Sequence, residues 1–516
     1  MDKNTILAFA LCAAVLFGYD TFFVAPKRAE AIKKHQIAGI KEDTKISPAV
    51  VPSSTEVGTT SKPPLSLGYK EENNDIKNTK LGISISNVGG SLHNIKVGDT
   101  DILPLTKVLT VSGYENEEFQ VKSLDANRAV YYFKNDRMEI KKTVEFKDEH
   151  NILVRMEINS AFDAKISLFN IDFIKHEINA HENGLYEYFV SVDNRIVRKG
   201  NASKFDSKEN KTVGGQVQFA GFRDHFNIIV IHPEGRTKTI DISKVAENEL
   251  NVTIASGKSQ SYDFSIYVGP QDTASMKKYG KGFEKAVAFS RFWLLNTISF
   301  AIYYTIPFLH LISRSWGLSI ILISLIIYGL SYPLTVKSMM SMRKMQQVQP
   351  KIKALQERFK DDPTKLNAEI MEIYKREKIN PLGGCLPFLL QMPLFVSLYQ
   401  VLWRSYYFQG QSFLWIKDLS LPDRLMTLPF SLPFLGNELN ILPILMGIVM
   451  FFQQKVSAKN TVAADEQQAM QQKMMMYFFP FFIGFIFYKF ASGLSLYFTV
   501  FYALSTWTQV QMSKTK

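Results

Sequence analysis

Hydrophobic and polar positions follow two different patterns along the chain, with the change near Lys285. Before it, apolar residues alternate with polar ones, whereas after Phe289 long apolar runs are broken by short basic loops. Alternation with a period of two is typical of half-buried strands, and an apolar run of about 18 residues is long enough to span a bilayer. The pattern therefore predicts a β domain followed by a bundle of transmembrane helices.

The β pattern is clearest from about Thr79 to Pro270, in segments such as LGISISNVGG, MEIKKTVEFKDEHNILVRMEINS and SYDFSIYVGP. β-branched and aromatic residues alternate there with charges, and Gly, Asn and Asp punctuate the ends. This predicts an antiparallel β-sandwich domain over residues 79–285, with a scaffold or partner-binding surface. A carbohydrate-binding or mutarotase-type site assembled from distant residues is the alternative. The histidines show no HxH or HExxH spacing: His93, His150, His176, His181, His225 and His232.

Two segments precede this domain. Residues 1–24 hold an apolar stretch from Ile6 to Val24 with no small-x-small cleavage site after it, which predicts an uncleaved transmembrane signal anchor. Residues 25–78 are rich in Lys, Pro, Ser and Thr, so we expect a flexible linker.

The second half of the chain contains five further apolar runs, which with the anchor make six predicted spans. Residues 286–312 are aromatic-rich but include Arg291, Asn296 and Pro307, which favours an amphipathic helix at the membrane interface. Residues 313–516 form the predicted five-helix core. Its spans are expected at Trp316–Val336, about Leu382–Trp403, Ile441–Gln454, Met474–Phe490 and Leu494–Val510.

Loop charges predict the topology. Residues 337–379 hold 11 Lys or Arg against 6 Asp or Glu, whereas residues 404–440 hold three of each. Because basic loops stay on the cytoplasmic side, the first loop is expected in the cytoplasm and the second outside. With alternating spans, the N-terminus is then cytoplasmic and the β domain lies outside.

The basic loop has its own helical pattern, with apolar residues at spacings of three and four that include Ile352 and Leu355. The sequence DDP at residues 361–363 supplies an Asp cap followed by a proline suited to the first helical turn. We therefore predict a cytoplasmic helical hairpin over residues 337–380. Its charged face is either a solvated surface or a contact for anionic lipid or ribosomal RNA.

Two spans carry stripes of polar residues. These stripes are Ser324, Tyr328, Ser331 and Thr335 on the first core span, and Ser495, Thr499, Tyr502, Thr506 and Gln509 on the last. Because polar side chains facing lipid are costly, the stripes are expected to face each other, a groove or water. Helix–helix hydrogen bonding is the alternative reading. The last five spans contain no Asp or Glu, which disfavours a proton- or cation-coupled transporter.

Composition adds mainly exclusions. The chain of 516 residues has a formal net charge of +12 and two cysteines, Cys12 and Cys385, so neither a disulfide framework nor a zinc cluster is expected. No Walker-type glycine loop is present, and nothing indicates a catalytic residue, a metal, a cofactor or a specific nucleic acid.

The residues also resemble a family. The run from PLTVKSMMSMRKMQ through NPLGGCLPFLLQMP, together with QQKMMMYFFPFF and SGLSLYF, is similar to the YidC membrane protein insertases of Gram-negative bacteria. The resemblance implies a periplasmic β-supersandwich, a five-helix core in the inner membrane and a cytoplasmic hairpin. It also implies a non-enzymatic function: receiving hydrophobic segments of nascent membrane proteins, alone or beside the Sec translocon, and releasing them sideways into lipid. The SKTK tail is too short for a strong ribosome-binding arm, so the ribosome is expected to be a weak partner.

Carried over by position, the resemblance places Ser324 at a groove hydroxyl, and Tyr497 and Phe498 at the two aromatic positions of the last span. Tyr328 stands where the family has an arginine, so the groove is expected to be polar without being strongly electropositive. The glycines and cysteine of NPLGGC are expected to loosen the joint between the hairpin and the next span: Gly383, Gly384 and Cys385.

Two other classes of protein remain as alternatives. A small-solute transporter would require an occluded site and an internal repeat among the spans. An envelope enzyme acting on carbohydrate, anchored by its membrane half, would place its essential residues in the β domain.

Overall fold

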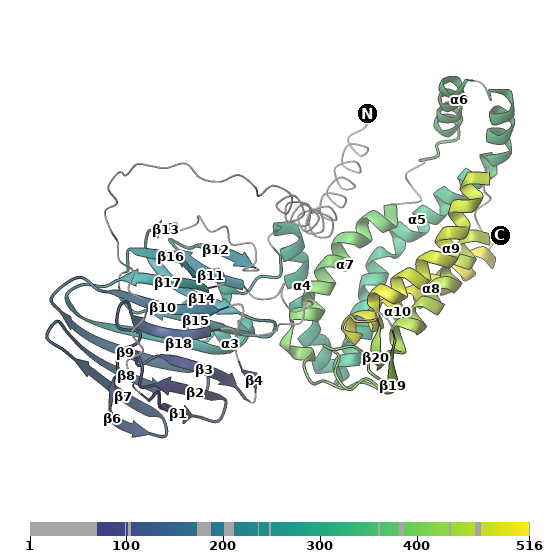
Figure 1. The fold of residues 1–516 in the computed structure, drawn as a ribbon. Coiled ribbons are helices and arrows are strands. Elements are labelled where there is room, and N and C mark those ends of the chain that lie inside the picture. The colour runs from purple at the N-terminus through teal and green to yellow at the C-terminus, as the bar shows by residue number, and fades with distance from the viewer. Residues whose placement is uncertain are drawn as a thin grey trace, which may run out of the picture.

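The computed structural model describes most of the chain after residue 69. The described residues are 70–98, 100–101, 105–172, 187–200, 211–235, 237–246, 249–290, 292–359, 362–380, 386–432, 435–459 and 466–514. The predicted anchor, most of the predicted linker and the joint residues Gly383, Gly384 and Cys385 lie outside them. Figure 1 shows a β domain beside a helical bundle, with one helical hairpin at the far end of the bundle.

The β domain consists of two nine-stranded antiparallel sheets. The first sheet contains, in spatial order, β1 (Asn73–Lys77), β2 (Leu81–Ser86), β3 (Leu92–Val97), β5 (Leu105–Val111), β10 (Lys165–Asp172), β17 (Glu249–Ala255), β16 (Thr239–Ala246) and β13 (Lys211–Gly214), with β4 (Thr100–Asp101) paired to β3. The second sheet contains β12 (Arg195–Gly200), β11 (Glu187–Val192), β14 (Val217–Arg223), β15 (Asn227–Pro233), β18 (Ser259–Pro270), β9 (Asn151–Ser160), β8 (Met138–Phe146), β7 (Arg128–Lys134) and β6 (Gln120–Asp125).

Alternating burial along the strands explains why these segments pair. In β8 every other residue is buried, and Ile140 and Val144 are both fully buried between the sheets. The hydroxyl of Tyr131 in β7 donates a hydrogen bond to the carbonyl oxygen of Ile85 in β2 at 3.2 Å, which joins the two sheets. The predicted antiparallel sandwich is therefore confirmed.

The predicted linker boundary at residue 78 is wrong, because β1 lies inside it and pairs along its length with β2. The strand reads NNDIK, and Ile76 is its only buried residue. An edge strand that is so polar has no alternating hydrophobic pattern, so its residues do not predict a strand.

One charged side chain lies inside the sandwich. Lys142 of β8 is 1% exposed, and its ammonium donates to the carbonyl oxygens of Gly90 at 2.5 Å and Leu109 at 2.6 Å. Both carbonyls belong to residues with positive φ, where the regular strand geometry is interrupted. Burial lowers the pKa of Lys142 to about 7.

The second half of the described chain is helical. Its elements are α3 (Thr273–Lys277), η3 (Phe283–Ala286), α4 (Trp293–Ser313), α5 (Trp316–Arg358), α6 (Pro363–Arg376), α7 (Leu386–Arg404), η5 (Tyr406–Phe408), β19 (Met426–Leu432), β20 (Gly436–Leu439), α8 (Leu442–Lys459), α9 (Glu466–Phe487) and α10 (Ser492–Lys514). The first core span and the first helix of the hairpin form one continuous helix of 43 residues, α5. Among the described helices, α4 and α5 are long and apolar enough to cross a membrane, while the apolar parts of α8 and α9 are shorter.

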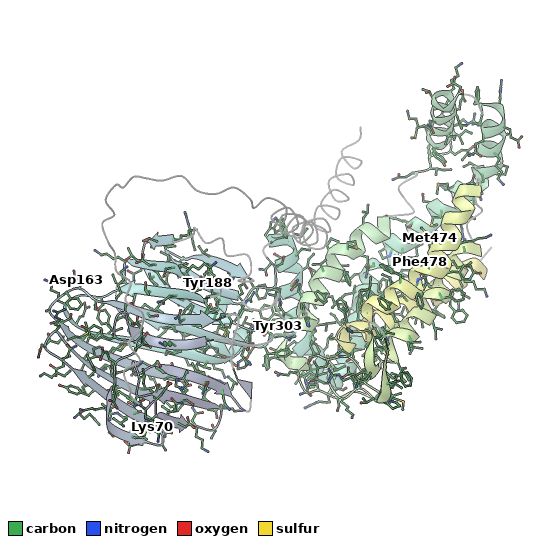
Figure 2. All side chains as sticks on the ribbon, viewed as in Figure 1. Lys70, Asp163, Tyr188, Tyr303, Met474 and Phe478 are labelled. Carbon is green, nitrogen blue, oxygen red and sulfur yellow. The ribbon has the colours of Figure 1, made fainter. Side chains whose placement is uncertain are left out.

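A buried carboxylate joins the β domain to the bundle. Asp272 caps α3 and also accepts hydrogen bonds from the hydroxyls of Tyr303 in α4 and Tyr407 in η5, each at 3.2 Å. Burial alone would raise the pKa of Asp272, but the hydrogen bonds from Ser275 and its neighbours outweigh it and the pKa lies below its ordinary value. Figure 2 shows Tyr303 at this junction.

We predict a pH signature from Lys142. Because its pKa is about 7 in the folded state and 10.5 ordinarily, the unfolded chain holds more protons between these values, so stability rises with pH in that window. The free energy of unfolding of the wild type, minus that of Lys142→Met, should increase by about 1.4 kcal/mol per pH unit. Unfolding of the β domain in detergent at pH 7, 8 and 9 measures this difference.

Lys141→Met is the matched control, because Lys141 is the exposed neighbour in the same strand and pairs with Glu157 at the surface. Its stability should run parallel to that of the wild type over the same pH range. Parallel curves for Lys142→Met as well would show that Lys142 keeps an ordinary pKa.

Candidate functional site

The two polar stripes predicted from sequence lie on helices that pack against each other, α5 and α10. Tyr328 of α5 is 7% exposed, and its hydroxyl donates a hydrogen bond to Oγ1 of Thr508 in α10 at 2.6 Å. The edge of its ring meets Phe501, with ring centroids 5.5 Å apart. We call the residues of the two stripes, together with Thr508, the polar seam: Ser324, Tyr328, Ser331 and Thr335 of α5, and Ser495, Thr499, Tyr502, Thr506, Thr508 and Gln509 of α10.

Four hydroxyls of the polar seam bond within their own helices. Ser324 donates to the Ile320 carbonyl at 2.6 Å and Thr335 to the Ser331 carbonyl at 3.0 Å. In α10, Thr499 and Thr506 each donate at 2.7 Å to the carbonyl four residues earlier. Such bonds satisfy the hydroxyl protons but do not link helices. The predicted hydrogen bonding between helices is therefore present at the Tyr328–Thr508 pair and absent for these four side chains.

A third helix, α7, packs against α10 beside the polar seam. Nε2 of Gln391 in α7 donates to the hydroxyl of Tyr497 at 3.2 Å, and Tyr497 is fully buried. Phe498 is 5% exposed, with its ring centroid 5.4 Å from that of Phe395 in α7. The two aromatic positions of the last span thus pack against α7.

Several buried polar atoms of these helices have no hydrogen-bond partner among the described residues. In α10 they are Oγ of Ser495 and Oε1 of Gln509, and in the neighbouring helices Oε1 of Gln400 and Oε1 of Gln453. Buried polar groups are costly when unpaired, so the bundle interior has unused capacity to bind water or a polar segment. A bundle of fully lipid-facing helices would not retain such groups.

The polar seam carries no charged side chain among its described residues. Arg343, at the end of the seam nearer the hairpin, donates to the carbonyl of Met512 in α10. Lys489 lies in the turn between α9 and α10, at the other end. Tyr328 therefore supplies an uncharged hydroxyl between the two ends of the seam. Its ring is packed in the interior of the bundle.

At the end of the bundle opposite α6, the loop between α7 and α8 covers the helices. Asp423 is 1% exposed and accepts hydrogen bonds from the backbone amides of Ile441 and Leu442 at the start of α8. The amides of Ser492 and Gly493 donate to carbonyls of the same loop. The ring of Phe413 packs so closely on Gly317 of α5 that a Cβ there would overlap it. The loop thus closes this end of the bundle.

The far end of α5 forms a helical hairpin with α6. Val348 and Ile352 of α5 pack with Ile379 in a small buried cluster, and Ile352 is 3% exposed. Leu355, which the spacing places in the same row, is only partly buried. Asp362 caps α6 with Pro363 in its first turn, as the DDP sequence predicts.

Sequence reasoning missed two members of this site. Thr508 lies one position outside the α10 stripe, so its contact with Tyr328 follows from how the helices rotate in packing. Gln391 lies in the QMP sequence of α7, a span with no polar stripe of its own. A glutamine within an apolar span was the available signal, because such side chains are costly in lipid.

Comparison with known proteins identifies the family. The model of the 60Kd inner membrane protein family matches residues 308–516, and the model of the YidC periplasmic domain matches residues 108–302. A membrane protein insertase YidC of Chlorobaculum tepidum is 28% identical over 571 residues, covering 100% of this chain and 95% of that protein. The chain belongs to the YidC family.

Other matches either cover a smaller part of the relative or, for solved structures, have a low TM-score. The membrane protein insertase YidC of Chloroherpeton thalassium is 39% identical over 255 residues, which is 49% of this chain and 42% of that relative. A crystal structure of an active YidC insertase aligns over 87% of this chain and 93% of that one, with 17% identity and a TM-score of 0.38. A putative aldose 1-epimerase from Escherichia coli K12 aligns over 39% of this chain with a TM-score of 0.29 and 9% identity. TM-scores this low establish no common fold.

We predict that Ile352→Asp opens the hairpin of this YidC-family chain. An unpaired carboxylate in the cluster with Val348 and Ile379 should destabilise the hairpin by about 3 kcal/mol or more. Proteinase K should then cleave residues 337–380 faster, while the variant still assembles in the membrane. Lys353→Asp, a neighbouring exposed position on α5, is the control and should be cleaved at the wild-type rate. Equal protection of both variants would contradict the packing.

Proposed function

We propose that this protein is a membrane protein insertase of the bacterial inner membrane. It receives hydrophobic segments of nascent membrane proteins in the polar seam and releases them laterally into the bilayer, alone or with the Sec translocon. The observation that carries this proposal is the polar seam itself, an uncharged polar interior in a bundle with an apolar outer surface. The proposal is also supported by the relatives of this chain in the comparisons, which bear the name membrane protein insertase YidC.

The physical reason lies in the segment to be inserted. An incoming hydrophobic helix brings flanking charges and unpaired backbone groups that hydrocarbon cannot solvate. Unpaired polar atoms such as Oγ of Ser495 and Oε1 of Gln509 give the seam capacity to solvate them. The loop around Asp423 closes the opposite end, so the path leads sideways to lipid and not across the membrane. This activity requires no covalent step, so we propose no enzymatic reaction.

The proposed topology places the N-terminus and the hairpin in the cytoplasm, and the β domain in the periplasm. The charge bias of residues 337–379 supports it. Although α4 is long enough to span, we propose that it lies at the interface. Tyr303, in the middle of α4, bonds to Asp272 of the β domain, and this contact requires the middle of the helix to be near the domain.

The hairpin is proposed as the first contact for clients and for anionic lipid headgroups. α5 is continuous from the polar seam into the hairpin, so movement of the hairpin is transmitted to the side chains of the seam. The ribosome is proposed as a weak partner, and no specific nucleic acid is involved.

A deletion experiment separates this function from that of an anchored carbohydrate enzyme. In cells depleted of their own insertase, a variant lacking most of residues 79–270 should support growth and insertion of a small single-span protein. The helical bundle carries the seam, which explains the expected survival. Complete loss of function by a deletion variant that still integrates into the membrane would favour the enzyme.

Client contact is predicted at the seam. A photoreactive residue at Tyr502, which is partly buried in the seam, should crosslink to a stalled nascent chain that exposes one hydrophobic segment. Trp507, on the same helix but 63% exposed, is the control and should give much weaker crosslinks. Equal crosslinking from both positions would mean that clients contact the outer surface of α10 instead.

Tyr328 is predicted to contribute through its hydroxyl and its ring. Tyr328→Phe removes the bond to Thr508 and should reduce insertion modestly, with a loss of about 1 kcal/mol of stability. Tyr328→Ala should reduce insertion more. Tyr328→Arg should be tolerated and should help clients with acidic tails.

Tyr332→Phe is the matched control for this series, because Tyr332 lies one turn along α5 and is 46% exposed. It should insert clients at the wild-type rate. If Tyr328→Arg instead raised insertion of every client many-fold from a near-zero start, the role assigned to Tyr328 would be wrong.

A further inference from the structure

The loop between α7 and α8 exposes large apolar side chains that the proposed function does not use. Trp415, Leu421 and Leu425 are about two-fifths exposed, whereas Leu414 is 75%, Met426 53% and Phe430 59% exposed. We call these six residues the outer-loop patch. Single exposed hydrophobic residues are ordinary, but a concentration of them in one loop marks an interaction surface.

The patch is held by a well-organised loop. Nε1 of Trp415 donates to Asp423 at 3.2 Å, and the same carboxylate binds the first amides of α8. Asn440 accepts from the amide of Arg424 and donates to the carbonyl of Tyr488 at 2.7 Å. The loop is thus tied to both neighbouring helix ends, and its apolar side chains are displayed on a defined framework.

Leu414 adds a sign of strain. It has a φ of 53°, a left-handed conformation that is uncommon for leucine, in a tight turn in which Phe413 and Ile416 exchange backbone hydrogen bonds. The turn points the leucine outward, where it is the most exposed member of the patch. In water a leucine gains nothing from this position, whereas in an apolar medium its burial is favourable.

The hairpin of β19 and β20 is two-stranded and amphipathic. The two strands pair with each other and form a sheet of their own. One pair across the hairpin is polar, Thr427 with Glu438, and Glu438 also forms an ion pair with Arg424 at 2.9 Å. The adjacent pair is apolar, Met426 with Leu439. An isolated hairpin is marginal in water, so an apolar environment on the Met426 side would stabilise it.

The surface that continues this patch is the apolar outer face of the bundle. β20 ends three residues before α8 begins, and Ile444, Leu445 and Ile448 in the first turns of α8 are exposed. Figure 1 shows the hairpin at the end of the bundle away from α6, beside α8 and α10. Figure 2 shows Met474 and Phe478, both more than half exposed, along the outer surface of α9.

Helix lengths indicate how deep the patch lies. The apolar segments Leu442–Ala458 of α8 and Lys473–Phe487 of α9 span about 25 Å and 22 Å at 1.5 Å per residue. The hydrocarbon core of a bilayer is about 30 Å thick. The shortfall is close to the depth of roughly 5–10 Å to which interfacial elements sink. An apolar hairpin at the end of these helices fills the missing thickness.

We propose that the outer-loop patch is a lipid-binding anchor, with Met426 and Phe430 inserted into the acyl chains of the outer leaflet. Arg424, Lys417 and the indole of Trp415 lie at the headgroup level, where such side chains are favoured. The anchor fixes the closed end of the bundle relative to the bilayer. It rests on the proposed topology and does not depend on insertion activity.

Depth-dependent quenching tests the anchor. In the full-length chain with Cys12 and Cys385 replaced by serine, a single cysteine replaces Met426 or Phe430 and carries an environment-sensitive fluorophore. The protein is reconstituted in phosphatidylcholine vesicles containing lipids with a nitroxide near the headgroup or deep in the chain. Both labels should lose most of their emission to the shallow nitroxide lipid, less to the deep one and little to aqueous iodide. Thr427→Cys, on the polar side of the hairpin, is the matched control and should be quenched mainly by iodide.

Two results would overturn the anchor. Labels at Met426 and Phe430 that iodide quenches as strongly as the label at Thr427 would place the hairpin in water. Labels shielded from both lipid nitroxides and iodide would show that protein covers the patch. Insertion by the same variants is measured separately: normal insertion with iodide-accessible labels refutes only the anchor, whereas lipid-quenched labels in a chain that inserts no client at all would count against the proposed function.

Discussion

The constraint on which the helical bundle depends is the cost of leaving a polar group unpaired in hydrocarbon. Four seam hydroxyls, among them those of Ser324 and Thr499, meet it by bonding back to their own helices. Tyr328 meets it across the helix pair through Thr508. Among the atoms that remain unpaired are Oε1 of Gln400 in α7, Oε1 of Gln453 in α8 and Oγ of Ser495 in α10, which gives the interior a polar character while the outer surface stays apolar.

The same constraint shapes the two ends of the bundle differently. At one end, Asp423 and Asn440 satisfy the backbone groups where α8 begins and where α9 ends, so the loop forms a closed cap. At the other end α5 continues beyond the bundle into a hairpin held by a small cluster that includes Ile352. A firmly bonded cap and a lightly packed hairpin give the bundle one fixed end and one end that can rearrange at low cost. The β domain is joined near the fixed end, through Asp272.

Much of this architecture could be predicted from the sequence, because periodicity reports burial. The alternation in β8 and β9 predicted the sandwich, and the residues DDP predicted the start of α6. The polar strand β1 was missed because an edge strand with one buried residue has no pattern. The partners Thr508 and Gln391 were missed because spacing along one helix does not say how neighbouring helices are rotated or which residue they present. The continuity of α5 through Pro333 and Pro350 also depends on packing, since proline predicts a break.

If the polar seam receives clients from the cytoplasm, water should reach it from the cytoplasmic side only. Single cysteines at Thr499 and Thr506, in a chain whose own cysteines are serine, can be treated with a membrane-impermeant thiol reagent on either side of sealed vesicles of known orientation. We expect modification from the cytoplasmic side, faster at Thr506 than at Thr499, and protection from the periplasmic side. Absence of modification from both sides would show a dry interior, and equal modification from both sides would show an open channel; either result would rule out a seam that receives clients from the cytoplasm.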